Sequence, residues 1–159
     1  MASGIMSEAI LIIASVIIAT SVAGVVMSQV GVFQSTFTTT TEGQKDTLLT
    51  DFKIIMATNT TNSNVGIWIK NTGQNPIDNV DKVDVYYGQI NNVTNIPYSQ
   101  AVQSNLSWKY DIIPTPYLQI MNTTSLNITS DSLQKGVTYQ VTVIAPNGVS
   151  DEQIFSLPS

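Results

Sequence analysis

Three carboxylates recur at a spacing of three residues, at Asp78, Asp81 and Asp84. Carboxylate oxygens are the ligands that Ca²⁺ prefers, so this spacing invites comparison with a calcium-binding loop. An EF-hand loop needs acids at alternating positions, Gly at its sixth position and Glu at its twelfth, and this segment has neither. We therefore interpret the segment as a solvated turn that leads into a strand, and we predict no metal site.

The remaining composition removes most catalytic chemistry. The 159 residues include no cysteine and no histidine, so thiol nucleophiles, serine–histidine relays and the usual zinc sites are excluded. The nine glycines are scattered and form no phosphate-binding loop. A net charge of −5, with six lysines and no arginine, argues against nucleic acid as a partner. We predict that the protein is not an enzyme and uses no cofactor and no small-molecule substrate.

One kind of chemistry that the sequence does favour is covalent modification. Acceptor motifs of the form Asn-x-Ser/Thr are sites for N-glycosylation in proteins outside the cytoplasm. Scarce lysine and abundant Thr, Asn and Ser also suit an external surface. Five such motifs, only a small excess over chance, make candidate glycosylation sites of Asn59, Asn92, Asn105, Asn122 and Asn127.

The element that positions this surface is an apolar N-terminal segment. No charge lies between Glu8 and Glu42, and a helix over Ala9–Phe33 would rise about 37 Å, enough to cross a hydrocarbon core of about 30 Å. Its Ile and Val residues favour strands in water, but a lone span in lipid must satisfy its backbone as a helix. A cleaved signal peptide is the alternative, yet no basic residue precedes the segment and the segment is too long. We predict a retained transmembrane helix within residues 1–34.

Small residues recur every four positions within that segment. Ser15, Ala19 and Ala23 would form one stripe that lets a second helix pack closely, although such residues are also simply common in membrane spans. Residues 35–50 form either a linker or an extension of the helix, and Gly43 weakens the second alternative.

From residue 51 to residue 159 the apolar residues alternate with a period of two. Val137, Tyr139, Val141 and Val143 give the clearest strand, and Asn147-Gly148 after it is a strong hairpin signal. We predict seven or eight short strands without intervening helices. The expected fold is therefore all-β, an immunoglobulin-like antiparallel β-sandwich outside the cytoplasm, preceded by the transmembrane helix.

One apolar segment of that domain, residues 112–121, is interrupted by Pro114 and Pro116. Prolines confine strands to sheet edges, so the segment is either a covered part of the core or a place where a second chain binds. For the second alternative we predict an interaction site that consists of Ile113, Tyr117, Leu118 and Ile120.

The order of these features resembles a known family. The motifs are Met1-Ala2-Ser3 with Ser7-Glu8, then Val22-Ala23-Gly24, Leu49-Thr50-Asp51-Phe52-Lys53-Ile54-Ile55, Ile69-Lys70-Asn71-Thr72-Gly73 and Pro76-Ile77-Asp78. Over residues 1–88 the chain is similar to FlaG, a motor-associated membrane protein of the archaellum, the archaeal flagellum.

The resemblance implies a single-pass membrane protein whose N-terminal helix is pilin-like and whose sandwich lies beneath the surface layer (S-layer). It further implies self-association and a FlaF-like sister protein that contacts the S-layer, so that the pair forms the static part of the motor. No catalytic residue is needed for that role.

Two alternatives remain. A type IV pilin-like or archaellin filament subunit would carry a basic residue before its cleavage site and Glu at its fifth mature position. Here Gly4 follows no Lys or Arg, and Glu8 would fall at the fourth position. An anchored ligand-binding module is the other alternative, but the sequence indicates no pocket for it.

Overall fold

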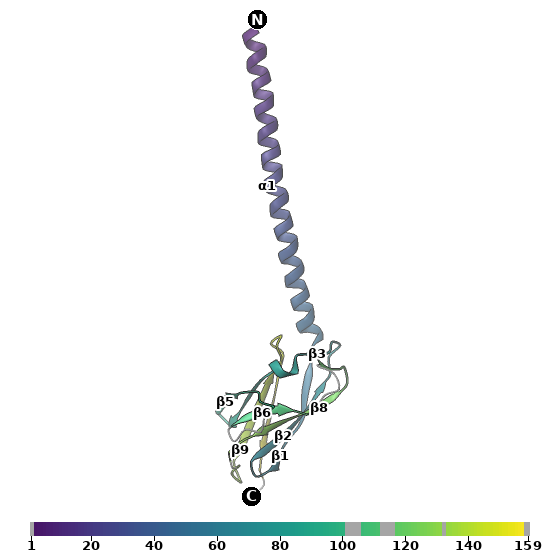
Figure 1. Cartoon of the computed structure of the whole chain (residues 1–159), viewed down its shortest axis with the longest axis vertical. Helices are drawn as coiled ribbons and strands as arrows, with labels where there is room; N and C mark the ends of the chain where they lie inside the picture. The colour runs from purple at the N-terminus through teal and green to yellow at the C-terminus, as the bar shows by residue number, and fades with distance from the viewer. Residues whose placement is uncertain (1, 101–105, 112–116, 132, 158–159) are drawn as a thin grey trace. The chain divides into compact units, whose positions relative to one another are not determined.

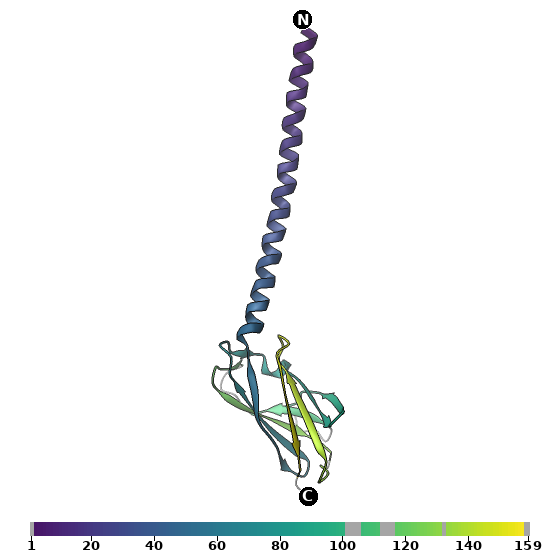
Figure 2. The ribbon, with the colours of Figure 1, turned by 180° about the vertical axis from the view of Figure 1, so that it is seen from behind.

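The computed structural model describes residues 2–100, 106–111, 117–131 and 133–157. The chain divides into two compact units, Met1–Gly43 and Gln44–Ser159. Figure 1 shows both units with labels on many of their elements, and Figure 2 gives the view from behind.

Helix α1 (Ala2–Leu49) is 48 residues long, so it rises about 72 Å. By length and composition it is apolar enough to cross a membrane, with a mean hydropathy of 2.7 over its most apolar window. The hydroxyls of Ser15, Thr20 and Ser21 donate to backbone carbonyls three or four residues earlier, so these polar groups are satisfied within the helix. In the polar part, Thr39 and Thr40 bond in the same way, and residues 35–49 are helical.

Two four-stranded antiparallel sheets make the second unit. One sheet has the strand order β1 (Phe52–Thr61), β2 (Asn64–Asn71), β8 (Thr123–Thr129) and β6 (Ser107–Tyr110). The other has the order β10 (Ser150–Ser156), β9 (Thr138–Ile144), β4 (Asp84–Gln89) and β5 (Asn92–Ile96). A two-stranded sheet pairs β3 (Ile77–Asp78) with β7 (Tyr117–Leu118), and a short 3₁₀ helix, η1 (Val80–Lys82), precedes β4.

The core lies between the two large sheets and follows the predicted period of two. On β9 the inward residues Tyr139, Val141 and Val143 are buried, and Leu126 and Ile128 on β8 face them from the other sheet. The predicted pattern of a helix followed by an antiparallel β-sandwich is confirmed.

The structure contains the predicted hairpin and three strands that the sequence pattern does not predict. Asn147-Gly148 does connect β9 to β10, which lie side by side in Figure 2, and Gly148 has a φ of 86° that favours glycine. The alternation does not predict strands β3, β5 and β8, because β3 has only two residues and because Asn, Ser and Thr outnumber the apolar residues in β5 and β8.

Candidate functional site at the base of the helix

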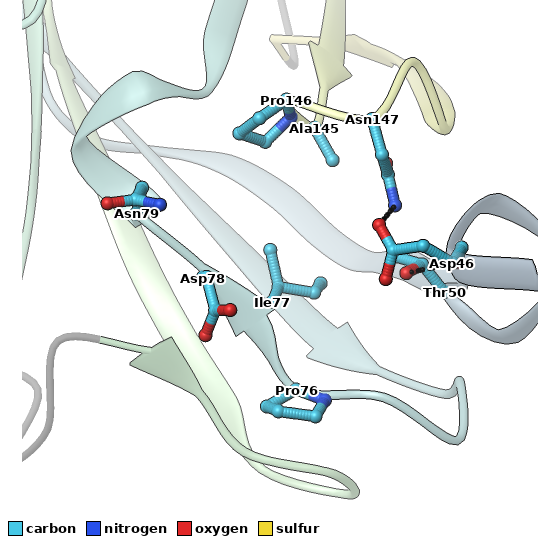
Figure 3. A pocket seen from close by; sticks show the side chains of 9 residues that line it. All are labelled: Asp46, Thr50, Pro76, Ile77, Asp78, Asn79, Ala145, Pro146 and Asn147. Carbon is cyan, nitrogen blue, oxygen red and sulfur yellow. Dashed lines mark hydrogen bonds between the residues drawn. The ribbon is translucent and has the colours of Figure 1, made fainter. Parts of the chain in front are cut away.

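The last turn of α1 is bound to two turns of the sandwich within the second unit. One carboxylate oxygen of Asp46 accepts a hydrogen bond from the Asn75 amide at 3.2 Å, and the other accepts one from the Asn147 amide at 3.3 Å. Figure 3 shows the Asn147 side chain pointing at this carboxylate. One acid therefore ties the helix end to the β2–β3 turn and to the β9–β10 hairpin.

Backbone bonds strengthen the same junction. The Leu49 carbonyl accepts hydrogen bonds from the backbone N–H groups of Gln74 at 2.7 Å and Asn75 at 3.2 Å. These bonds satisfy a carbonyl that has no partner within the helix. The Thr50 hydroxyl donates to the Asp46 carbonyl at 2.8 Å. Gly73 fits here because a Cβ at this position would lie 2.6 Å from the Leu49 carbonyl oxygen.

The side chain of Asn71 stabilises the β2–β3 turn by hydrogen bonds. Its side chain is fully buried, and its amide donates to the carbonyls of Asn75 at 2.9 Å and Leu118 at 3.0 Å. Its side-chain oxygen accepts from the Gly73 amide at 3.0 Å. The Thr72 hydroxyl next to it donates to the Asp51 carboxylate at 2.8 Å. The Asn71-Thr72-Gly73 and Leu49-Thr50-Asp51 motifs, which carried the family resemblance, therefore meet at this junction.

An open pocket of about 290 Å³ lies beside the junction. Figure 3 shows its lining: Asp46, Thr50, Pro76, Ile77, Asp78, Asn79, Ala145, Pro146 and Asn147. The lining combines two carboxylates and two side-chain amides with apolar residues, so it offers both polar and apolar contacts. Among the described residues, no group of three His, Cys, Asp or Glu side chains could hold a metal ion.

A second contact joins the edge strands β1 and β10. The Asp151 carboxylate accepts from the Ile54 amide at 2.8 Å and from the Lys53 ammonium at 3.1 Å. The hydrogen bond and the charge of Asp151 raise the pKa of Lys53. Asp151 thereby covers an unpaired backbone donor on the edge of the first sheet.

The predicted interaction residues differ in how far they are exposed to solvent. Leu118 is a core residue with 3% of its surface exposed and pairs with Ile77, which corrects its prediction as part of an interaction surface. Tyr117 is half-buried and Ile120 is 46% exposed, whereas Ile113 lies outside the described residues. Leu118 lies in the core beside Ile77 in the two-stranded sheet, so for this residue the segment is a covered part of the core and not a binding surface.

The other predicted residues are spread over the chain. Ser15, Ala19 and Ala23 are exposed on α1. Of the candidate glycosylation sites, Asn59, Asn92 and Asn122 are exposed, and Asn127 is half-buried and donates to Asp111 at 3.2 Å. Asn105 lies outside the described residues.

The residues that build the helix base were not predicted as a site. Asp46 is 29 positions from Asn75 and 101 positions from Asn147 in the sequence. Single polar residues in turns carry no periodic signal. The available signal was the clustering of turn-forming residues around Asn71 and Asn147, which indicates turns but not their contacts.

Comparison with solved structures identifies proteins of this architecture. The chain is similar to the "Archaellum periplasmic stator protein FlaG from Sulfolobus acidocaldarius", at 25% identity and a TM-score of 0.61, over 67% of this chain and 100% of that chain. It is also similar to a chain of the "Archaellum periplasmic stator protein complex FlaF and FlaG" of the same organism, at 25% identity and a TM-score of 0.60, over 67% of this chain and 90% of that chain. These similarities confirm the predicted resemblance to FlaG.

A filament protein shares the fold over more of the chain. The archaeal flagellum of Methanospirillum hungatei strain JF1 matches 96% of this chain and 93% of that chain, at 16% identity and a TM-score of 0.63. No curated protein sequence matches the chain. The sequence model of archaeal-type flagellin matches residues 2–155. The chain therefore belongs to the archaeal-type flagellin family and is a component of the archaellum.

Proposed function

We propose that this protein is a FlaG-like stator component that anchors the archaellum motor to the cell envelope. The supporting similarity is the 25% identity to FlaG, which extends over the whole of that solved chain. In the proposed topology residues 1–34 span the membrane, residues 35–50 connect the span to the sandwich and are helical as far as Leu49, and residues 51–159 lie outside the cytoplasm beneath the S-layer.

The observation that carries this proposal is the joint at the base of the helix. A stator must resist torque, so its membrane anchor has to be joined firmly to the domain that contacts the envelope. The helix end is fixed by the Asp46 carboxylate, by the Leu49 carbonyl and by the buried Asn71 side chain beneath them. These contacts favour load transmission, and they need no catalytic group.

The proposed partners follow from the relatives. Because FlaG is found in a complex with FlaF, we infer a FlaF-like partner for this chain and, through it, contact with the S-layer. Tyr117 and Ile120 remain our candidates for self-association, and Ser15, Ala19 and Ala23 remain candidates for helix packing in the membrane. The five acceptor asparagines remain candidates for glycosylation.

A filament subunit is the alternative, favoured by the flagellin family model and by the filament protein that matches nearly the whole chain. The two functions differ in processing and in location. A stator component keeps its N-terminus and stays in the membrane fraction, whereas a filament subunit loses its first residues and is recovered from sheared filaments.

Intact-mass measurement of the chain, purified separately from membranes and from filaments, tests the proposal. We expect the unprocessed mass, with allowance for any glycans, in the membrane fraction and none of the chain in washed filaments. A shortened chain in the filament fraction would establish the filament subunit instead.

A further inference from the structure

The hairpin at the helix base contains a chemically reactive pair of residues. Asn147-Gly148 is the only Asn-Gly pair of the chain. An asparagine side chain loses ammonia most readily before glycine, because a residue without Cβ lets its backbone nitrogen approach the side-chain carbonyl carbon. Asn147 also lines the open pocket beside the junction, so water has access to it (Figure 3). By sequence and by access, Asn147 is therefore the asparagine of this chain that is most prone to deamidation.

In the folded chain three hydrogen bonds oppose this reaction. The Gly148 N–H, which must lose its proton to react, donates to the Ala145 carbonyl at 2.9 Å. The Asn147 side-chain oxygen accepts from the Val149 N–H at 3.3 Å, and its amide donates to the Asp46 carboxylate at 3.3 Å. The first two bonds lie within the hairpin itself, whereas the third requires the last turn of α1. The helix end therefore takes part in protecting Asn147.

We propose that Asn147 is a deamidation site whose reactivity is controlled by the helix end. While Asp46 holds the side-chain amide, Asn147 is protected. When the helix end leaves the hairpin, the amide is released and Asn147 converts to aspartate or isoaspartate. This control follows from the contact between helix and hairpin, so it is independent of the stator role proposed above.

The reaction needs only water as a co-reactant. The Gly148 nitrogen forms a bond to the side-chain carbonyl carbon (Cγ) of Asn147, and the bond from Cγ to the amide nitrogen breaks. Ammonia leaves with the proton that the Gly148 nitrogen gives up. Water then opens the resulting cyclic imide: addition at Cγ yields aspartate, and addition at the main-chain carbonyl carbon yields isoaspartate. No oxidant or reductant takes part.

Neither product restores the contact with the helix. Aspartate in place of Asn147 puts a second carboxylate beside Asp46, so repulsion between like charges replaces a hydrogen bond. Isoaspartate adds one carbon to the main chain of a turn that Pro146 and Gly148 shape. The bond between Asp46 and Asn75 uses the other carboxylate oxygen and is retained. Deamidation therefore separates the helix end from the β9–β10 hairpin irreversibly and leaves it joined to the β2–β3 turn.

The first measurement compares deamidation rates. The full-length chain, produced in a host without N-glycosylation, is kept in detergent at neutral pH, sampled over time and cleaved after lysine. Peptide 136–159 has Asn147 as its only asparagine, and fragmentation assigns the mass gain to this residue. We expect Asp46→Ala to deamidate about tenfold faster than the wild type, because a hydrogen bond to a charged group is lost. Asn75→Ala, which removes the other side-chain bond of Asp46, is the matched control and should keep the wild-type rate.

An internal control separates release of the helix end from general unfolding. Asn62-Ser63 lies in the β1–β2 turn, at the opposite end of β1 from the helix, and is followed on peptide 54–70. We expect its rate to be the same in all three proteins. Acceleration of Asn62 and Asn147 together in Asp46→Ala would show an effect of overall stability and overturn the specific control by Asp46. Equal rates at Asn147 in the wild type and in Asp46→Ala would overturn it as well.

The second measurement tests the consequence for the joint. Asn147→Asp reproduces the aspartate product directly. At neutral pH we expect it to lower the melting temperature of the otherwise wild-type chain by about 4 °C. In the Asp46→Ala background we expect a much smaller decrease, because no carboxylate faces residue 147. An equal decrease in both backgrounds would overturn repulsion from Asp46 as the reason why the contact is not restored.

Discussion

At the scale of single residues, the Asn71 side chain connects several parts of the chain at the base of the helix. Its side chain is fully buried and joins Gly73, Asn75 and Leu118 by three hydrogen bonds. Asn95, by comparison, is exposed and makes one long contact of 3.5 Å with Asp84. The two residues have the same side chain in opposite environments, which makes them a matched pair.

We expect Asn71→Ala to lower the free energy of unfolding by about 2–3 kcal/mol, because it leaves buried backbone groups without partners. We expect Asn95→Ala to change it by less than about 0.5 kcal/mol. Chemical denaturation of the full-length protein in detergent, followed by tryptophan fluorescence, measures both. Equal effects of the two substitutions would contradict the role given to Asn71.

Gly73 gives a second prediction at this scale. A Cβ at residue 73 would contact the Leu49 carbonyl and the Asp51 amide, so we expect Gly73→Ala to destabilise the fold by about 1–3 kcal/mol. At Gly43 nothing lies within 4 Å of the added Cβ, and Gly43→Ala in the helix should stabilise by about 0.5–1 kcal/mol. Thermal unfolding monitored by circular dichroism compares the two, and a neutral Gly73→Ala would show that the helix end and the turn are not closely packed.

Because of Tyr87, we expect the folding stability to depend on pH. Its pKa is raised by burial from 10.0 to about 12 in the folded protein, so above pH 10 the unfolded chain loses the proton first. Folding stability should therefore fall between about pH 10 and pH 12, by up to about 2–3 kcal/mol from this residue. The difference between wild type and Tyr87→Phe, measured by denaturation from pH 8 to pH 12, should follow that course. A difference that does not vary with pH would contradict the burial of the hydroxyl.

At the scale of elements, the edges β1 and β10 are joined through one side chain. Asp151 accepts a bond from the backbone of Ile54 and one from the exposed Lys53 side chain. The backbone bond should matter more, because exposed ion pairs contribute little.

We therefore expect Asp151→Ala to lower the free energy of unfolding by about 1–2 kcal/mol and Lys53→Met to change it by less than about 0.5 kcal/mol. Denaturant titration of both variants and of the double variant measures the two terms separately. If Lys53→Met were as damaging as Asp151→Ala, the ion pair and not the backbone bond would hold the two edges together.

The same scale shows what the sequence could predict. Alternation identifies β9 because every second residue is apolar and buried, and Asn147-Gly148 identifies the hairpin because its Gly adopts a positive φ. The pattern does not predict strand β8, because Thr124 occupies an inward position and the outward residues of the strand are polar. The contacts at the helix base could not be predicted from the sequence either, because they join isolated polar residues that come together only in the folded domain.

At the scale of the whole molecule, the proposed stator role makes the protein a mechanical component. In that role the apolar helix would be the membrane anchor and the β-sandwich would offer the surface for partners, while the Asp46 contacts join the last turn of α1 to the sandwich. The proposed stator role requires the sandwich to lie outside the cytoplasm.

Labelling of intact cells with a membrane-impermeant amine reagent tests that location most directly. All six lysines, from Lys45 to Lys135, follow the apolar part of the helix, so every labelled lysine reports on the C-terminal side of the membrane span. We predict that exposed Lys53 and Lys135 are modified in intact cells to the same extent as after lysis, while a cytoplasmic control protein stays unmodified. Lysines that become reactive only after lysis would contradict the account.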